Sequence, residues 1–229
     1  MRRFLKRAAL ALASLAVLGF AGSLCLTWWF AHATPGQYRH FFNFIYRHQS
    51  QAAFNHEANG LLVETVANLA PGRALDIAMG EGRNAVYLAG RGWDVTGFDV
   101  SDEALEQANA RAAKAGVRAR FLREGSQTFD YGHEQWDLIV LSYAFAPIHD
   151  AAYIRRLRDS LKPSGVIVFE HYIRPPGMGR DTGTPDRGEL LRLFSGFEIR
   201  RHEEVQAASD WQGRRRAALA RLVAVKPPA

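Results

Sequence analysis

Apolar and polar positions follow one another along the chain in a pattern that predicts regularly spaced strands and helices from about residue 57 onward. Short apolar runs are typical of buried strands, and apolar residues three or four positions apart are typical of helices. The predicted strands cover 74–79, 94–100, 118–122, 137–143, 165–171, 197–204 and 217–225. The predicted helices cover 61–69, 83–90, 102–114, 150–161 and 189–194.

This alternation predicts an α/β fold with a doubly wound, Rossmann-like, mostly parallel sheet. No helix is predicted between the last two strands, so we expect them to pair antiparallel. With 229 residues the chain is long enough for one sizeable core. We expect a basic N-terminus and membrane anchor at 1–33, a connector helix at 34–56 and one domain at 57–229.

The N-terminal part of the chain has the character of a membrane anchor. No charged residue occurs between Ala8 and Ala31. A helix of that length reaches roughly 36 Å, more than the ~30 Å apolar core of a bilayer. Trp28 and Trp29 lie near its far end, where indole rings favour the interface. A cleaved signal peptide remains open, because Ala31-His32-Ala33 fits a cleavage site, although its apolar stretch would be unusually long.

The charge distribution favours a membrane over nucleic acid as partner. Four of the 29 basic residues precede the apolar stretch, which leaves 25 basic against 23 acidic residues in the rest of the chain. We therefore expect no nucleic-acid binding. The aromatic- and histidine-rich segment 34–52 is consistent with a helix lying on a lipid surface. The alternative is a lid over the active site.

The candidate chemistry begins at the first predicted strand. The segment from Ala74 to Ala85 reads ALDIAMGEGRNA, which places Gly80 and Gly82 in a turn between a strand and a helix. Glycines at such a turn let the backbone approach a ligand closely. Asp99 ends the next strand, where a carboxylate can accept hydrogen bonds from a ribose diol.

Two carboxylates decide between the cofactors that such a turn can hold. Asp76 lies on the strand and Glu81 lies within the turn. They would repel a pyrophosphate but attract a sulfonium with an ammonium group, and at 4 Å the interaction is about 4 kcal/mol at an effective dielectric constant near 20. The pattern therefore disfavours an NAD(P)-dependent oxidoreductase, which remains the alternative.

The stretch from Ala74 to Gly116 resembles the cofactor-binding half of class I S-adenosylmethionine-dependent methyltransferases. It is most similar to the bacterial tellurite-resistance-like group, whose Gly-x-Gly-Arg-Asn turn matches residues 80–84 and whose Gly-aromatic-Asp-Val-Thr-Gly strand matches residues 92–97. The resemblance implies a seven-stranded sheet with an antiparallel last strand, and S-adenosyl-L-methionine as cofactor. The cofactor-binding residues that it implies are Asp76, Ala78, Gly80, Glu81, Gly82, Asn84, Asp99, Val100, Ser101, Glu124, Gly125 and Ser126.

The acceptor side of the site is less well defined. Ligands of open sheets bind at the carboxyl ends of the strands. The residues expected there are Tyr143, His149, His171 and Tyr172. His171 is the best general base, Tyr143 is the second catalytic candidate, and Tyr143, His149 and Tyr172 are expected to contact substrate. Cys25 is the single cysteine, and no residue cluster has metal-ligand spacing, so we expect no metal site.

The leading hypothesis is therefore a membrane-tethered methyltransferase that acts on a small acceptor, with lipophilic molecules among the candidates. A cytosolic cofactor favours a cytoplasmic domain, whereas the basic N-terminus favours the opposite orientation. A non-catalytic cofactor-binding scaffold is the third hypothesis, and the conjunction of Gly80, Gly82 and Asp99 argues against it. The acceptor atom and the oligomeric state stay open.

Overall fold

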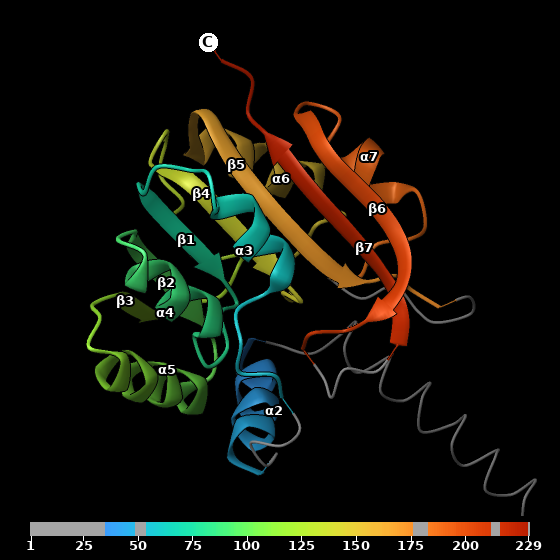
Figure 1. The fold of residues 1–229 in the computed structure, drawn as a ribbon. Helices are drawn as coiled ribbons and strands as arrows, with labels where there is room; N and C mark the ends of the chain where they lie inside the picture. Colours follow the sequence, from blue (N-terminus) through green and yellow to red (C-terminus); the bar gives the residue numbers. More distant parts are fainter. Residues whose placement is uncertain (1–34, 49–53, 176–182, 212–215, 229) are drawn as a thin grey trace, which may run out of the picture.

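A computed structural model describes residues 35–48, 54–175, 183–211 and 216–228, which form an α/β fold around one sheet (Figure 1). The sheet has seven strands in the order β3-β2-β1-β4-β5-β7-β6. β7 pairs antiparallel with both of its neighbours, and the other pairs are parallel. The strands are β1 (Arg73–Ile77), β2 (Asp94–Asp99), β3 (Arg120–Arg123), β4 (Trp136–Ser142), β5 (Leu161–Tyr172), β6 (Glu198–Ala208) and β7 (Arg216–Val225).

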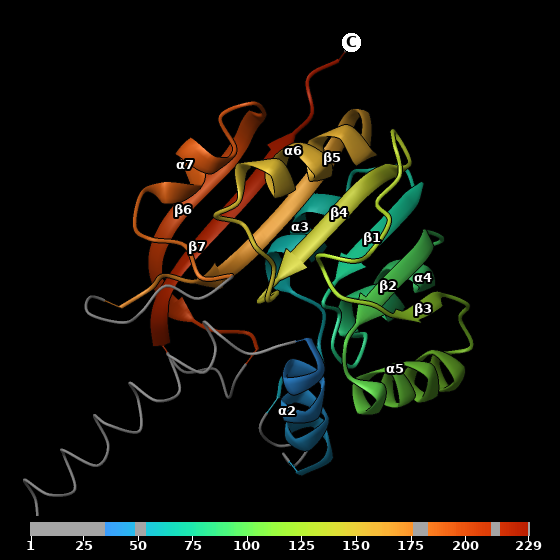
Figure 2. The same ribbon diagram turned by 180° about the vertical axis from the view of Figure 1, so that it is seen from behind.

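Helices cover both faces of this sheet. One face carries α3 (Gly60–Val66), α4 (Arg83–Gly90) and α5 (Asp102–Ala115), and the other carries α6 (Ala151–Ser160) and α7 (Glu189–Leu193) (Figures 1 and 2). A further helix, α2 (Pro35–His48), packs beside α5, beyond the carboxyl ends of the central strands. The predicted doubly wound sheet with its antiparallel last strand is confirmed.

The continuous apolar runs in the sequence reflect burial of the central strands on both faces. In β4, Leu138 and Val140 pack with α3 and α4, whereas Ile139 and Leu141 pack with α6. All four side chains are fully buried. Two cores therefore share one strand, which fixes β4 rigidly at the centre of the sheet.

The helix boundaries follow local capping signals. Ser101 accepts a hydrogen bond from the backbone N–H of Ala104 and begins α5, and Gly116 ends this helix in the left-handed conformation at φ +66°. Asp150 caps α6 by accepting from the N–H of Ala152. These caps are readable in the sequence because each depends on residues only a few positions away.

Three boundaries differ from the prediction by three or more residues, and one of them is the end of β6, at Ala208 rather than 204. The first helix of the domain, α3, ends at Val66, and Leu69 is exposed. Strand β5 begins at Leu161 rather than 165, because the buried Leu161 pairs with Trp136 of β4. Pairing across a sheet depends on residues distant in the sequence, so the local pattern does not reveal it.

Within the described residues, no helix is both long enough and apolar enough to cross a bilayer. The predicted anchor Ala8–Ala31 and its cleavage-site alternative lie outside those residues, and so does the middle of the loop 174–188.

Candidate cofactor and acceptor site

A cavity of about 320 Å³ opens at the carboxyl ends of β1, β2 and β4, beneath α2. Most of the residues proposed from the sequence line it, namely Asp76, Ala78, Gly80, Glu81, Asn84, Asp99, Val100, Glu124, Gly125, Ser126 and Tyr143. Gly82, Ser101, His149, His171 and Tyr172 are not among the lining residues. The structure thus gathers residues from the ends of four strands, β1, β2, β3 and β4, around one space.

The geometry of the turn between β1 and α4 requires glycine at two positions. Gly80 has a φ of +57°, and a Cβ there would collide with the Tyr46 hydroxyl of α2. Gly82 has a φ of +75°, and a Cβ there would lie 2.9 Å from that of Ala108 on α5. Gly82 therefore permits helix packing, whereas Gly80 faces the cavity. Ala78 adopts a φ of +50°, which strains a residue that has a Cβ.

Asp99 is held rigidly at the end of β2. Its carboxylate accepts hydrogen bonds from the backbone N–H groups of Gly80 and Ser101, both at 2.9 Å. Burial raises the pKa of Asp99, and these N–H groups act against that shift. A carboxylate fixed in this way at the edge of a cavity can still accept hydrogen bonds from ligand hydroxyls. Ser101 contributes through its backbone and its helix cap rather than from the cavity wall.

Asp76 is the least satisfied polar group of the site. Its side chain is 1% exposed, and Oδ2 has no hydrogen-bond partner among the described residues. Burial raises its pKa to about 7, against the opposing effects of Arg83 and the Ala85 N–H. A buried carboxylate oxygen that lacks a partner fits a cationic ligand group, because such a group would satisfy both its charge and its lone pairs.

Glu81 differs from the expectation that both carboxylates act on a cationic ligand. Its Oε1 lies 2.8 Å from Nη2 of Arg111 and 2.5 Å from Nδ1 of His56. Arg111 belongs to α5, so the neutralising charge comes from another element of the fold. Asp76, rather than Glu81, therefore carries the attraction for a cation.

Helix α2 closes one side of the cavity with Tyr38, Phe42 and Tyr46. It is attached to the start of α5 by charged and polar contacts. Arg39 forms an ion pair of 2.6 Å with Asp102, and the Ser101 hydroxyl donates to Asn43 at 2.7 Å. This arrangement supports the lid hypothesis for the connector. The opposite face of α2 exposes Phe44, which is 60% accessible.

Aromatic rings form a continuous row along the cavity. Tyr46 stacks on Phe54, Phe54 lies 5.5 Å from Trp211, and Trp211 stacks on Tyr143 at 5.7 Å between ring centroids. Phe42 and Phe145 form a separate edge-on pair. Phe54 and Trp211 are not predictable from the sequence, because both lie in connecting segments without a recognisable motif.

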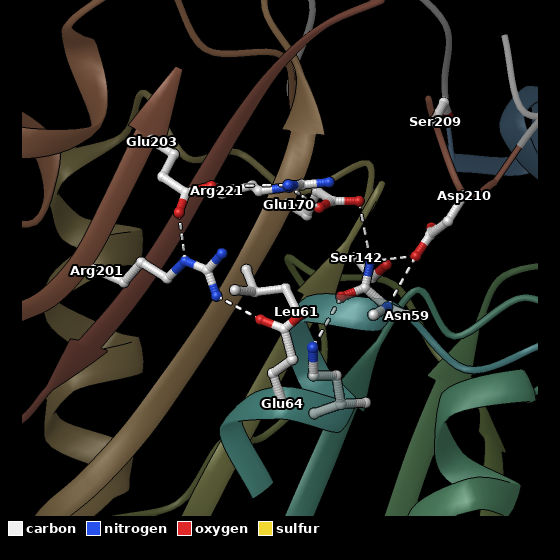
Figure 3. Close-up of polar contacts among 12 residues, drawn as sticks. Asn59, Leu61, Glu64, Ser142, Glu170, Arg201, Glu203, Ser209, Asp210 and Arg221 are labelled. Atoms are coloured by element: carbon white, nitrogen blue, oxygen red, sulfur yellow. Dashed lines mark hydrogen bonds and ion pairs between the residues drawn. The ribbon is translucent and has the colours of Figure 1, made fainter. Parts of the chain in front are cut away.

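Tyr143 combines backbone strain with a buried hydrogen bond. Its φ of +54° places it in the left-handed region directly after β4. Its hydroxyl donates to Oε1 of Glu170 at 2.6 Å, and burial is the main cause of its raised pKa. Glu170 is itself 1% exposed and is bound by Asn59 and Arg221 (Figure 3). The phenol is thus committed to a structural network, and Tyr143 contributes as a wall of the cavity.

The other three acceptor-side candidates are engaged elsewhere. His149 lies 3.3 Å from Glu189 and 3.2 Å from the Thr184 carbonyl, so it joins α7 to the preceding loop. The Tyr172 hydroxyl contacts the Ser209 hydroxyl at 2.7 Å. His171 is 5% exposed, and its ring centroid lies 5.9 Å from that of Tyr143. The structure does not bring these residues to the cavity.

Comparison with known proteins agrees with this geometry. Residues 74–165 match a family model described as a methyltransferase domain. The ribosomal protein L11 methyltransferase of Thermus thermophilus is 36% identical over 160 residues, which are 69% of this chain and 57% of that protein. The chain spans about half the length of the curated relatives that it matches, with 40% for an uncharacterised Mycobacterium tuberculosis protein.

Solved structures share the fold. TehB from Haemophilus influenzae superimposes with a TM-score of 0.60 at 18% identity and covers 80% of this chain and 65% of that one. The Burkholderia thailandensis 1,6-didemethyltoxoflavin-N1-methyltransferase, solved with 1,6-didemethyltoxoflavin and S-adenosylhomocysteine bound, has a TM-score of 0.62 at 19% identity. It covers 86% of this chain and 92% of that one.

Proposed function

Because the chain carries a class I, S-adenosylmethionine-dependent methyltransferase domain, we propose that it transfers a methyl group to a small, lipophilic acceptor. The observation that carries the proposal is the pair of buried carboxylates at neighbouring strand ends. Asp76 has an oxygen without a partner, and Asp99 is fixed by backbone N–H groups, and both line one cavity.

These residues fit the cofactor group by group. Asp76 would hold the ammonium group, and Asp99 would accept hydrogen bonds from the ribose hydroxyls. Gly80 would let the backbone pass close to the amino-acid portion, while Val100 and Ser126 would line the adenosine side. When bound, S-adenosylmethionine supplies an electrophilic methyl group on a sulfonium centre.

The contribution of the chain itself is mainly positioning. The thioether leaving group needs no protonation, so holding the acceptor in line with the methyl group can supply up to about 7–11 kcal/mol of the barrier reduction. The aromatic row and the α2 lid would exclude water and hold the acceptor against the cofactor.

The lining of the cavity supports an apolar acceptor. Rings of Phe42, Phe54, Phe145, Tyr143 and Trp211 surround the space, and such surfaces bind apolar molecules mainly by removing their area from water. Polar side chains line the cavity at the glycine turn and in the segment that follows β3, and both of these regions would face the cofactor. The Burkholderia enzyme has the same fold and acts on a small molecule, which is consistent with a small acceptor for this chain.

We also propose that the uncharged segment Ala8–Ala31 tethers the domain to a membrane, on its cytoplasmic side. Pro35 begins α2 only a few residues after this segment, so a tether would place the lid close to the lipid surface. Exposed Phe44 is suited to that environment. Alkaline extraction and protease protection of the full chain, compared with a chain lacking residues 1–33, test the tether and its orientation. Release of the full chain by alkali would refute the tether. When protease is added outside intact cells, a domain on the cytoplasmic face is protected, whereas a domain on the outer face is cleaved.

The cofactor assignment is tested by calorimetry on the purified full chain in detergent. S-adenosylmethionine and NADH are titrated in parallel into wild-type protein and the Asp99→Asn variant. We expect binding of S-adenosylmethionine alone, weakened by the substitution. Binding of NADH alone would favour an oxidoreductase. If S-adenosylmethionine binds but no acceptor in a panel of lipophilic phenols and thiols is methylated, the scaffold hypothesis gains ground.

A further inference from the structure

Trp211 occupies the centre of the aromatic row, and contacts of its rings, its backbone and the preceding residue hold it there. It follows β6, in the connection to β7, and lies between Phe54 on one side and Tyr143 on the other. Its carbonyl accepts a hydrogen bond from the N–H of Asn55 at 3.0 Å. Without the indole, the rings from α2 would lose contact with the ring at the end of β4.

The residue before it, Asp210, acts as the anchor. Its carboxylate accepts a hydrogen bond from Asn59 at 2.8 Å (Figure 3). It also accepts from the N–H of Gly60 at 3.0 Å and from Arg83 at 2.9 Å. Arg83 also donates to the Asp210 carbonyl at 2.9 Å. Asp210 therefore connects the start of α3, the start of α4 and the segment that carries Trp211.

This anchor links the two halves of the site. Arg83 is the first residue of α4, directly after the glycine turn, and its side chain is only 6% exposed. It donates to the Glu57 carbonyl as well as to Asp210. These bonds tie the position of Trp211 to the turn that would hold the cofactor. The aromatic row that would contact the acceptor therefore stays at a constant distance from the cofactor.

We propose that Trp211 is the residue that determines acceptor specificity, and that it selects planar aromatic acceptors over puckered aliphatic ones of equal size. Asp210 is the positioning residue that fixes the indole. The inference rests on the proposed methyltransferase function. A flat ring can stack against or meet the edges of the aromatic row, whereas a saturated ring gains only area burial. Aromatic pairing of this kind favours the planar molecule by about threefold to tenfold.

The test measures binding of 2-naphthol and of decahydro-2-naphthol by calorimetry, with and without S-adenosylhomocysteine. Wild-type protein is expected to prefer 2-naphthol by about threefold to tenfold. Trp211→Leu should reduce this preference to less than twofold, and Trp211→Phe should retain part of it. Asp210→Asn should weaken the preference while leaving S-adenosylhomocysteine affinity within a few fold. Tyr87→Leu, which alters a partly buried ring outside the cavity, is the matched control and should behave as wild type.

The outcomes separate the two proposals. An unchanged preference in Trp211→Leu, or no preference in the wild type, overturns the role of Trp211. Failure of the wild type to bind S-adenosylhomocysteine or S-adenosylmethionine refutes the proposed function instead. Retained S-adenosylhomocysteine binding by Trp211→Leu and Trp211→Phe shows that these variants are folded, so a changed naphthol preference then reports on the acceptor wall.

Discussion

Cofactor binding is expected to weaken as the pH falls below 7, because Asp76 must lose a proton before it can pair with an ammonium group. Burial raises its pKa from 3.8 to about 7 in the cofactor-free protein. About half of the carboxyl groups are then ionised at pH 7 and about 3% at pH 5.5. If only the ionised form binds, the dissociation constant increases about 15-fold over this interval.

The same shift sets the sign of its effect on stability. A carboxyl group whose pKa is raised by folding contributes stability that is fully present below about pH 4 and is lost as the pH rises through about 7, the pKa of Asp76 in the folded protein. The cost of ionising Asp76 in the cofactor-free protein is on the order of 4 kcal/mol above pH 7. A bound cation would offset this cost, so we expect ligand stabilisation of the fold to grow between pH 5.5 and 7.

Calorimetry at several pH values, in buffers of different ionisation enthalpy, measures both the affinity and the protons released. Wild-type protein should release close to one proton per bound cofactor at pH 5.5. Asp76→Asn should bind the cofactor more weakly. Its affinity should not change with pH over this interval, and its binding should release no proton. Asp94→Asn, at the opposite and exposed end of β2, should reproduce the wild-type curve. A wild-type affinity that does not change with pH, or an equal pH dependence of affinity in Asp76→Asn, would refute the reasoning.

Three further predictions concern the glycine turn, the buried network and the lid. Ala78→Gly should raise the denaturant midpoint by an amount equivalent to about 1 kcal/mol, because glycine relieves the strain at a φ of +50°; a lower midpoint would show that the Ala78 methyl group contributes more through packing. Arg221→Leu should lower the free energy of unfolding by about 3 kcal/mol, because buried Glu170 loses its charged partner; equilibrium denaturation measures this, and a change below about 1 kcal/mol would contradict it. Asp102→Asn should speed hydrogen exchange in α2 while changing global stability by less than about 1 kcal/mol, because the Arg39 ion pair is partly exposed; unchanged exchange in α2 would argue against this attachment of the lid.

The amino-acid sequence by itself determined the order of strands and helices along the chain, the parallel sheet, and the turn and carboxylates that we propose for the cofactor. These features depend on short-range signals. Asp76 lies one residue before the end of β1 and Asp99 ends β2. Because the ends of parallel strands meet at one edge of the sheet, their proximity follows from the alternation alone. Gly80 is recognisable for the same reason, because the tight turn that needs it involves only its immediate neighbours.

Tertiary structure alone decided which residues line the proposed acceptor side of the cavity and which residue neutralises the carboxylate of the glycine turn. Trp211 reaches the cavity because Asn59 and Arg83, more than a hundred positions earlier, bind Asp210. Arg111 neutralises Glu81 from another helix, and Glu170 binds the hydroxyl of Tyr143. Burial and hydrogen-bond partners are set by which elements pack together, and no local pattern records that. For this reason the sequence identified the glycine turn and its carboxylates but not the aromatic row that would hold the acceptor.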